Sequence, residues 1–140
     1  MKHRLLVDIN ILLDVLAQRH PHHVASSAIW AVAETRDAEA WVSANSITTL
    51  YYLLRRYSNH ATAMRGIQLV VDVFMVVTVD AALITKSLNS PCGDFEDAVQ
   101  YESALRANAT AIVTRNVRHF RRCSIPALTP DAFLASANFQ

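Results

Sequence analysis

Hydrophobic and polar residues follow two spacings along this chain, and the two alternate. Short apolar runs bounded by polar or turn-forming residues are typical of buried strands, and they occur at residues 4–7, 40–43, 74–79 and 111–114. Between them, apolar residues recur every three or four positions, which predicts helices at residues 11–16, 47–54, 61–72, 81–88 and 95–107 and two more from residues 24 and 130. Strands that alternate with helices favour a parallel sheet covered on both faces. The pattern predicts an α/β fold.

Residues at the predicted helix starts refine this picture. We expect Asp80 to cap the helix at 81–88, and Asn45 or Ser46 to cap the helix at 47–54. Pro130 suits the first position of the last helix, where its missing N–H costs nothing. The core side of helix 95–107 is predicted to carry Phe95, Ala98, Val99 and Leu105.

Length and composition indicate one domain over residues 1–140, because no composition shift or low-complexity stretch marks a linker. Apolar residues make up 52% of the chain and charged residues 18%, which leads us to expect a homodimer. The basic and then apolar start imitates a signal peptide, but Asp8, Asn10 and Asp14 interrupt it. The apolar run at 69–79 is too short to cross a bilayer. We therefore expect a cytoplasmic protein without a membrane span.

Candidate chemistry gathers around three aspartates. Asp94 and Asp97 open the predicted helix at 95–107, and residues three apart share a helix face, whereas Glu96 points away from them. Asp8 follows the first strand, and Thr114 ends a later one, so both should reach the same edge of a parallel sheet. Asp94 could be only a helix cap, and Asp97 only a favourable charge near the helix dipole. Converging carboxylates repel, however, unless a divalent cation balances them.

Other residue types narrow the possible functions. The two glycines exclude a glycine-rich phosphate loop or dinucleotide fingerprint. Cys92 and Cys123 lack the spacing of zinc sites and are expected to be inert. Net charge is only +1, yet four arginines crowd residues 115–122, and guanidinium groups suit phosphate. This cluster is either a nucleic-acid contact or an ordinary solvated surface.

Four motifs in order resemble the PIN-domain family, and look most like its small members related to VapC-type toxins. They are Leu6-Val7-Asp8-Ile9-Asn10, Thr49-Leu50-Tyr51-Tyr52-Leu53-Leu54-Arg55, Asp94-Phe95-Glu96-Asp97-Ala98 and Val113-Thr114-Arg115-Asn116. The resemblance spans nearly the whole chain. It implies a three-layer α/β/α sandwich with a central parallel sheet, and an endoribonuclease dependent on Mg²⁺ or Mn²⁺. An antitoxin protein would be its partner.

Residue by residue, the resemblance implies that Asp8, Asp94 and Asp97 are catalytic metal ligands and that Thr114 is the catalytic hydroxyl of the late strand. Asn10 and Asn116 would contact the metal-bound water or the RNA phosphate, although Asn10 could be only a helix cap. Three arginines are the candidates for contacts with the RNA backbone: Arg115, Arg118 and Arg122.

Two departures from the family pattern leave an alternative open. Thr49 stands where the family often has a Glu, and Asn116 stands where an Asp is common. With three acids we expect one firmly held metal and a second recruited partly by the substrate phosphate. The alternative is a catalytically degenerate PIN fold that binds RNA or protein. An aspartate-nucleophile phosphatase of the haloacid dehalogenase type is disfavoured, because Asn10 and Leu12 stand where its loop needs Asp and Thr.

Overall fold

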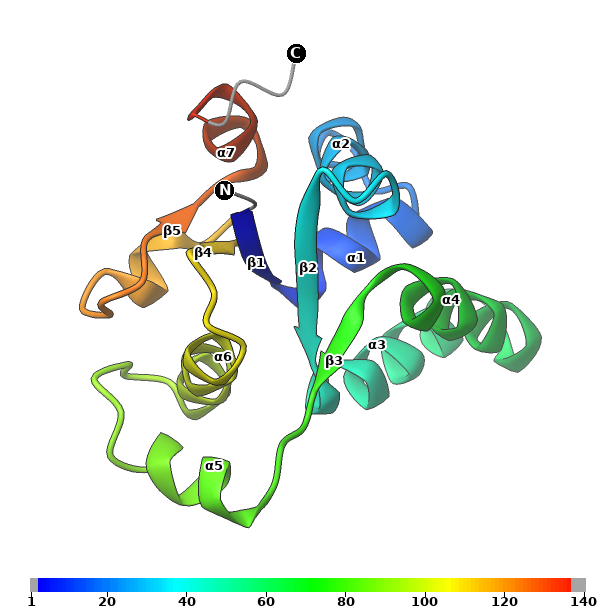
Figure 1. Ribbon diagram of the computed structural model, residues 1–140. Coiled ribbons are helices and arrows are strands. Elements are labelled where there is room, and N and C mark those ends of the chain that lie inside the picture. The colour runs from blue at the N-terminus through cyan, green and yellow to red at the C-terminus, as the bar shows by residue number, and fades with distance from the viewer. Residues whose placement is uncertain (1–2, 137–140) are drawn as a thin grey trace.

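A five-stranded, fully parallel sheet forms the centre of the computed structural model, which describes residues 3–136. The strand order is β3-β2-β1-β4-β5 (Figure 1). The strands are β1 (His3–Val7), β2 (Ala38–Ser43), β3 (Met75–Val77), β4 (Ala111–Val113) and β5 (Ala127–Leu128). The parallel sheet predicted from the sequence is confirmed. The two-residue β5 was not predicted, because so short a strand has no hydrophobic period to read.

Helices cover both faces of this sheet. They are α1 (Ile9–Leu16), α2 (His23–Glu34), α3 (Ala44–Tyr57), α4 (His60–Val73), α5 (Ala81–Ser87), α6 (Phe95–Arg106), α7 (Pro130–Ser136) and the short 3₁₀ helix η1 (Val117–Phe120). The larger core lies between one sheet face and α1, α2, α3, α4 and α7. The smaller core joins the other face to α6 and η1, and α5 packs on α6. The chain is therefore the expected three-layer α/β/α sandwich.

Strand β1 lies in the middle of the sheet and is buried on both sides. Leu5 and Val7 belong to the larger core and Leu6 to the smaller one, as expected for side chains that alternate between faces. Val7 is paired with Val113 of β4. The next residue of each chain segment therefore leaves the sheet at the same edge.

Helix starts agree with the sequence at two positions. The Asp80 carboxylate accepts a hydrogen bond from the backbone N–H of Leu83 at 3.0 Å, so it caps α5 as predicted. Pro130 is the first residue of α7. The prediction for α3 was wrong, since this helix begins at Ala44 with Ser43 in the N-cap position.

The predicted core side of α6 was partly wrong. Ala98 and Val99 are buried, but Phe95 and Leu105 are 48% and 41% exposed. The buried face of this helix also contains two polar residues, Gln100 and Ser103. Apolar spacing cannot detect a buried face that is partly polar, so the pattern pointed to a neighbouring face.

A buried ionic cluster ties the early helices to the segment after β4. Asp14 of α1 is fully buried. Its carboxylate accepts hydrogen bonds from Arg19 and Ser26, each at 3.0 Å, and Arg115 Nε lies 3.1 Å from it. A carboxylate this deep in the protein needs such partners, because an unpaired buried charge is costly.

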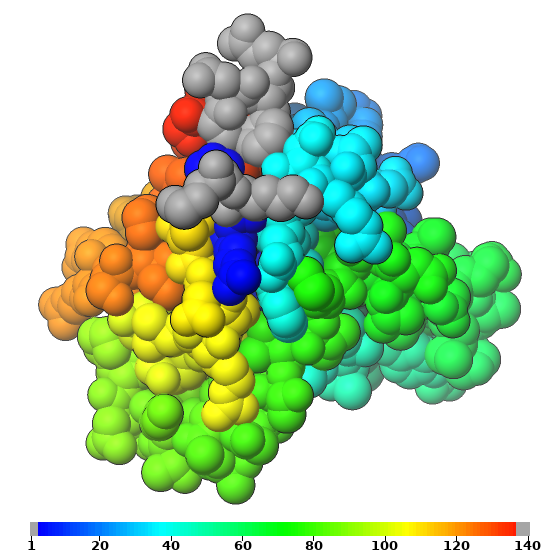
Figure 2. Space-filling model, in the orientation of Figure 1, coloured from blue at the N-terminus to red at the C-terminus, as the bar shows by residue number. Residues whose placement is uncertain are grey.

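Two segments distant in sequence meet beside α6. Residues 88–94, which precede α6, lie next to residues 117–126, and the two appear as adjoining light-green and orange surfaces in Figure 2.

Within residues 3–136, no helix is both long and apolar enough to cross a membrane.

Candidate functional site

Asp8 and Thr114 meet at the carboxyl edge of the sheet. The Thr114 hydroxyl donates a hydrogen bond to Asp8 Oδ2 at 2.9 Å and accepts one from the backbone N–H of Asn116 at 3.0 Å. Thr114 is fully buried. Its hydroxyl is therefore fixed in direction, and it holds the Asp8 carboxylate in one orientation.

Asp94 and Asp97 come from the start of α6. Asp94 Oδ1 accepts the backbone N–H of Asp97 at 3.1 Å, so this aspartate does cap its own helix. Asp97 Oδ2 lies 3.1 Å from Nδ1 of His119 in η1. Capping and lining a site are compatible roles, because a carboxylate has two oxygens and several lone pairs.

A pocket of about 190 Å³ brings these acids together. It is lined by Asp8, Ile9, Asn10, Asp94, Glu96, Asp97, Gln100, Asn116 and His119. Five of the residues expected at the site thus reach one cavity, and Thr114 lies behind Asp8. Glu96 also lines the pocket, contrary to the expectation that it points away. The pocket lies at the N-terminal end of α6, where side chains from different sides of the first turn can line it.

Asn10 is not a helix cap. Helix α1 begins at Ile9 with Asp8 in the N-cap position, which puts Asn10 inside the first turn. Its side-chain Oδ1 accepts a hydrogen bond from Arg19 at 3.2 Å. The interpretation of Asn10 as only a helix cap is therefore wrong, and Asn10 lines the pocket.

A neutral polar network faces α3, and the sequence pattern did not predict it. Gln100 Nε2 donates to Ser46 Oγ at 3.1 Å, and the Ser46 and Ser43 hydroxyls lie 2.8 Å apart. Gln100 lines the pocket, whereas Thr49 does not, and the Thr49 hydroxyl bonds the Asn45 carbonyl instead. Gln100 is three residues after Asp97 and six after Asp94, so helical spacing was the signal that could have found it.

A second cavity, of about 320 Å³, adjoins the first and is basic on one side. It shares Asp94, Asp97 and His119 with the acidic pocket, and it is also lined by Pro91, Gly93, Arg118, Arg121 and Arg122. Of the three arginines expected to contact the RNA backbone, Arg118 and Arg122 line this cavity. Arg115 does not, since its guanidinium pairs with the buried Asp14.

Burial dominates the electrostatics of two acids. Removal from water raises the pKa of Asp8, while Thr114, nearby backbone N–H groups and Arg115 oppose the rise. Burial also raises the pKa of Asp97, the charge of His119 lowers it, and Asp94, Asp8 and Glu96 raise it further. Both shifts mean that negative charge at this pocket is only partly compensated by the protein.

The donor chemistry of the pocket fits a hard divalent cation. Three aspartates and two asparagines supply only oxygen ligands of the kind that Mg²⁺ and Mn²⁺ prefer. Across residues 3–136, no three acidic, histidine or cysteine side chains stand close enough together to hold an ion. Asp8, Asp94 and Asp97 are each engaged with a protein partner instead. A cation would compete with those bonds and, in return, relieve the repulsion among the acids.

Replacing Asp8 by Asn should stabilise the metal-free protein at pH 7 by roughly 0.5–2 kcal/mol. The pKa of Asp8 is raised in the folded protein. Its protonated form therefore contributes stability that is fully present below the unfolded-state pKa of about 3.9, and this stability is lost as the pH rises through the folded-state pKa. The gain over wild type should therefore shrink towards pH 4. Urea unfolding between pH 4 and 8 measures it, with Asp72→Asn on the surface of α4 as the matched control. A less stable Asp8→Asn at pH 7 would make Asp8 a structural residue.

Solved structures with the same fold include VapBC and VapC proteins at low identity. VapBC2 from Rickettsia felis, bound to a promoter DNA fragment, is 13% identical, with a TM-score of 0.67 over 90% of this chain and 98% of that one. Mycobacterium tuberculosis VapC20, a Sarcin-Ricin loop cleaving toxin, is 16% identical, with a TM-score of 0.64 over 77% and 86%. VapBC-1 from nontypeable Haemophilus influenzae is 18% identical, with a TM-score of 0.65 over 91% and 98%.

A comparison with curated proteins gave no significant match. In contrast, the family model described as "PIN domain" matches residues 4–118, which is most of the chain and includes all four motifs of the sequence analysis. This match and the shared sandwich fold agree with each other. The chain belongs to the PIN-domain family.

Proposed function

We propose that this protein is a metal-dependent endoribonuclease, and that residues 1–140 act as a single PIN domain. The observation that carries the proposal is the convergence of Asp8, Asp94 and Asp97 on one pocket at the carboxyl edge of the sheet. Membership of the PIN-domain family supports a nuclease in general. When bound, Mg²⁺ or Mn²⁺ supplies positive charge for the phosphate and a water of lowered pKa.

The residues of the chain have separate tasks in this proposal. Asp8, Asp94 and Asp97 hold the cation. Thr114 keeps the Asp8 carboxylate in place, and His119 does the same for Asp97. The side-chain amides of Asn10 and Asn116 orient the attacking water or the scissile phosphate, because an amide can both donate and accept.

The RNA strand would follow the basic cavity next to the acidic pocket. Arg118, Arg121 and Arg122 line that cavity, and it shares three residues with the acidic pocket, so a phosphate bound there adjoins the acids. Arg115 retains 27% side-chain exposure beside its ion pair with Asp14, and we assign it a secondary role in RNA contact. RNA as substrate is supported by the VapC20 neighbour, a Sarcin-Ricin loop cleaving toxin.

The same neighbours support a toxin–antitoxin context for this chain. Several of the similar structures are VapBC or toxin–antitoxin complexes. We propose that an antitoxin protein neutralises this chain and that the chain acts in the cytoplasm as a homodimer. Large exposed apolar side chains such as Tyr57, Leu69 and Leu88 offer surface for such contacts.

The second candidate is a degenerate PIN fold that binds RNA without cleaving it. The observation in its favour is that the neutral Gln100 of α6 lines the pocket where it faces α3, and that its amide bonds the hydroxyl of Ser46 rather than an acid. Asn116 likewise replaces an acid common in the family. Binding of Mn²⁺ and RNA without any cleavage would favour this candidate.

Purified protein should cleave structured RNAs into discrete products in the presence of Mn²⁺, and a chelator should abolish the products. Asp97→Asn should lower the rate by at least about 10–100-fold, the loss that even outer-shell partners of a catalytic metal cause. Asp72→Asn, which removes an acid outside the pocket, should cleave at the wild-type rate. Products that persist unchanged in chelator would refute the metal-dependent mechanism.

A carboxylate introduced on the α3 side should tighten metal binding only where the side chain lines the pocket. We expect Gln100→Glu to raise the Mn²⁺ affinity roughly fivefold, equivalent to about 1 kcal/mol, because residue 100 lines the cavity. Thr49→Glu should leave the affinity unchanged, since Thr49 lies outside the lining. Titration calorimetry of both folded variants decides between them. The reverse result would restore residue 49 as the position equivalent to the family's Glu.

Arg118→Ala should weaken RNA binding and reduce its salt dependence by about 0.7 in the slope of log K against log salt, the loss of one phosphate contact to a single strand. Arg65→Ala on α4 is the matched control and should change neither quantity. Arg115→Ala should chiefly lower the melting temperature, because it removes a cation from the buried Asp14. Fluorescence anisotropy at several salt concentrations provides the measurement. An unaltered slope for Arg118→Ala would mean that RNA binds another face.

A further inference from the structure

Cys92 and Cys123 form an unexpected contact beside the basic cavity. They are 31 residues apart, yet their Sγ atoms lie 2.8 Å from each other. A covalent S–S bond measures about 2.05 Å, so the sulfurs are less than about 1 Å from bonding distance. Both residues are free cysteines and both are partly exposed. We expected both cysteines to be inert from their sequence spacing, which does not reveal this contact.

We propose that Cys92 and Cys123 are a redox-active dithiol, a site of reversible oxidation by small anionic disulfides. Their surroundings suit an anionic oxidant. Pro91 and Gly93 flank Cys92, and both line the basic cavity. Arg122 precedes Cys123 and lines the same cavity, together with Arg118 and Arg121. Guanidinium groups attract carboxylate-bearing molecules, which raises the local concentration of such an oxidant.

The chemical step is a two-stage thiol–disulfide exchange. Both thiols are partly exposed, so either can react first, and the two orders give the same disulfide. In the order that begins with Cys92, its thiolate displaces one thiolate from the small disulfide R–S–S–R and forms a mixed disulfide with the other half. Cys123 then loses its proton and attacks the Cys92 sulfur, which releases the second R–S⁻. The protein loses two protons and two electrons, and the oxidant gains them as two R–SH.

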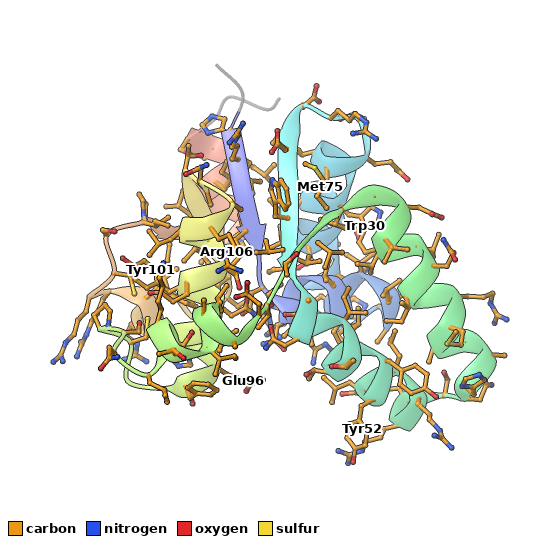
Figure 3. The ribbon with its side chains drawn as sticks, turned by 60° about the horizontal axis from the view of Figure 1, so that its bottom comes forward. Trp30, Tyr52, Met75, Glu96, Tyr101 and Arg106 are labelled. Atoms are coloured by element: carbon orange, nitrogen blue, oxygen red, sulfur yellow. The ribbon has the colours of Figure 1, made fainter. Side chains whose placement is uncertain are left out.

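The protein already holds both cysteines in place for this step. The Cys123 backbone N–H donates to the Phe120 carbonyl at 3.0 Å. The adjacent Ser124 hydroxyl lies 2.8 Å from the hydroxyl of Tyr101, which projects from α6 towards this loop (Figure 3). On the other side, the Cys92 backbone N–H donates to Ser90 Oγ at 3.3 Å. Closing the bond therefore requires little backbone movement.

The cross-link would join the two walls of the basic cavity. One wall is the loop that leads to Asp94, and the other is the segment that carries Arg118 and His119. The disulfide would fix the distance between the α6 acids and the arginines proposed to contact RNA. It would also constrain the unfolded chain by closing a long loop.

The test is oxidation of the wild-type protein in glutathione buffers of increasing GSSG content. Intact mass should fall by two hydrogen atoms without a glutathione adduct, the protein should stay the same size, and dithiothreitol should reverse the change. Peptide mapping should recover Cys92 linked to Cys123. The melting temperature of the oxidised form should rise by roughly 5–10 °C. Two free thiols after treatment, stable glutathione adducts, or links between molecules would each overturn the proposal.

Single-cysteine variants provide the matched controls. Cys92→Ser and Cys123→Ser should each retain a glutathione adduct on the remaining cysteine and should show no rise in melting temperature. A rise of equal size in either variant would mean that something other than the cross-link causes it. The wild-type measurement requires no variant, so a misfolded variant leaves the test intact.

Discussion

The pairing of β1 with β4 is the constraint on which the candidate site depends. Parallel strands in register deliver the residues that follow them to one edge, and Val7 paired with Val113 delivers Asp8 and Thr114 there. Since β1 is buried on both faces, its register is specified by the packing of Leu5, Leu6 and Val7. A register shift would place apolar residues at the site and the aspartate in the core.

Two aspartates of the α1 segment, Asp8 at its N-cap and Asp14 within the helix, illustrate how partners decide the role of a carboxylate. Asp14 is fully buried and has two arginines and a serine around it, so its charge is matched within the protein. Among residues 3–136, Asp8 accepts a side-chain hydrogen bond from one neutral group, the Thr114 hydroxyl, and burial raises its pKa. The matched carboxylate holds structure together. The unmatched one retains capacity for an external cation, at a cost in stability.

Helix α6 combines structural and chemical demands in one short segment. Its first turn carries Asp94 as cap and Asp97 as partner of His119, while its buried face carries Gln100 towards α3. The same turn borders the basic cavity, and Cys92 lies two residues before it. The acids, the arginines and the thiol pair are therefore neighbours because one helix start and one loop meet the segment after β4.

Local patterns determined a large part of this protein. Apolar runs specified the four longer strands, helical spacing specified the helices and put Asp94 beside Asp97, and the motif order identified the family. Each strand run, helical period and motif is complete within a short stretch of the chain, and the order of the motifs is read directly along it, which is why the sequence alone carries these signals.

Only the tertiary structure decided the contacts between distant residues. The pairs Asp14–Arg115, Ser46–Gln100 and Cys92–Cys123 join residues 101, 54 and 31 positions apart, and no local period encodes such distances. The prediction of the core side of α6 was wrong for the same reason. Buried polar residues of this helix bond to partners outside its apolar stripe. Hydrophobic spacing predicts burial only where the buried side chains are apolar.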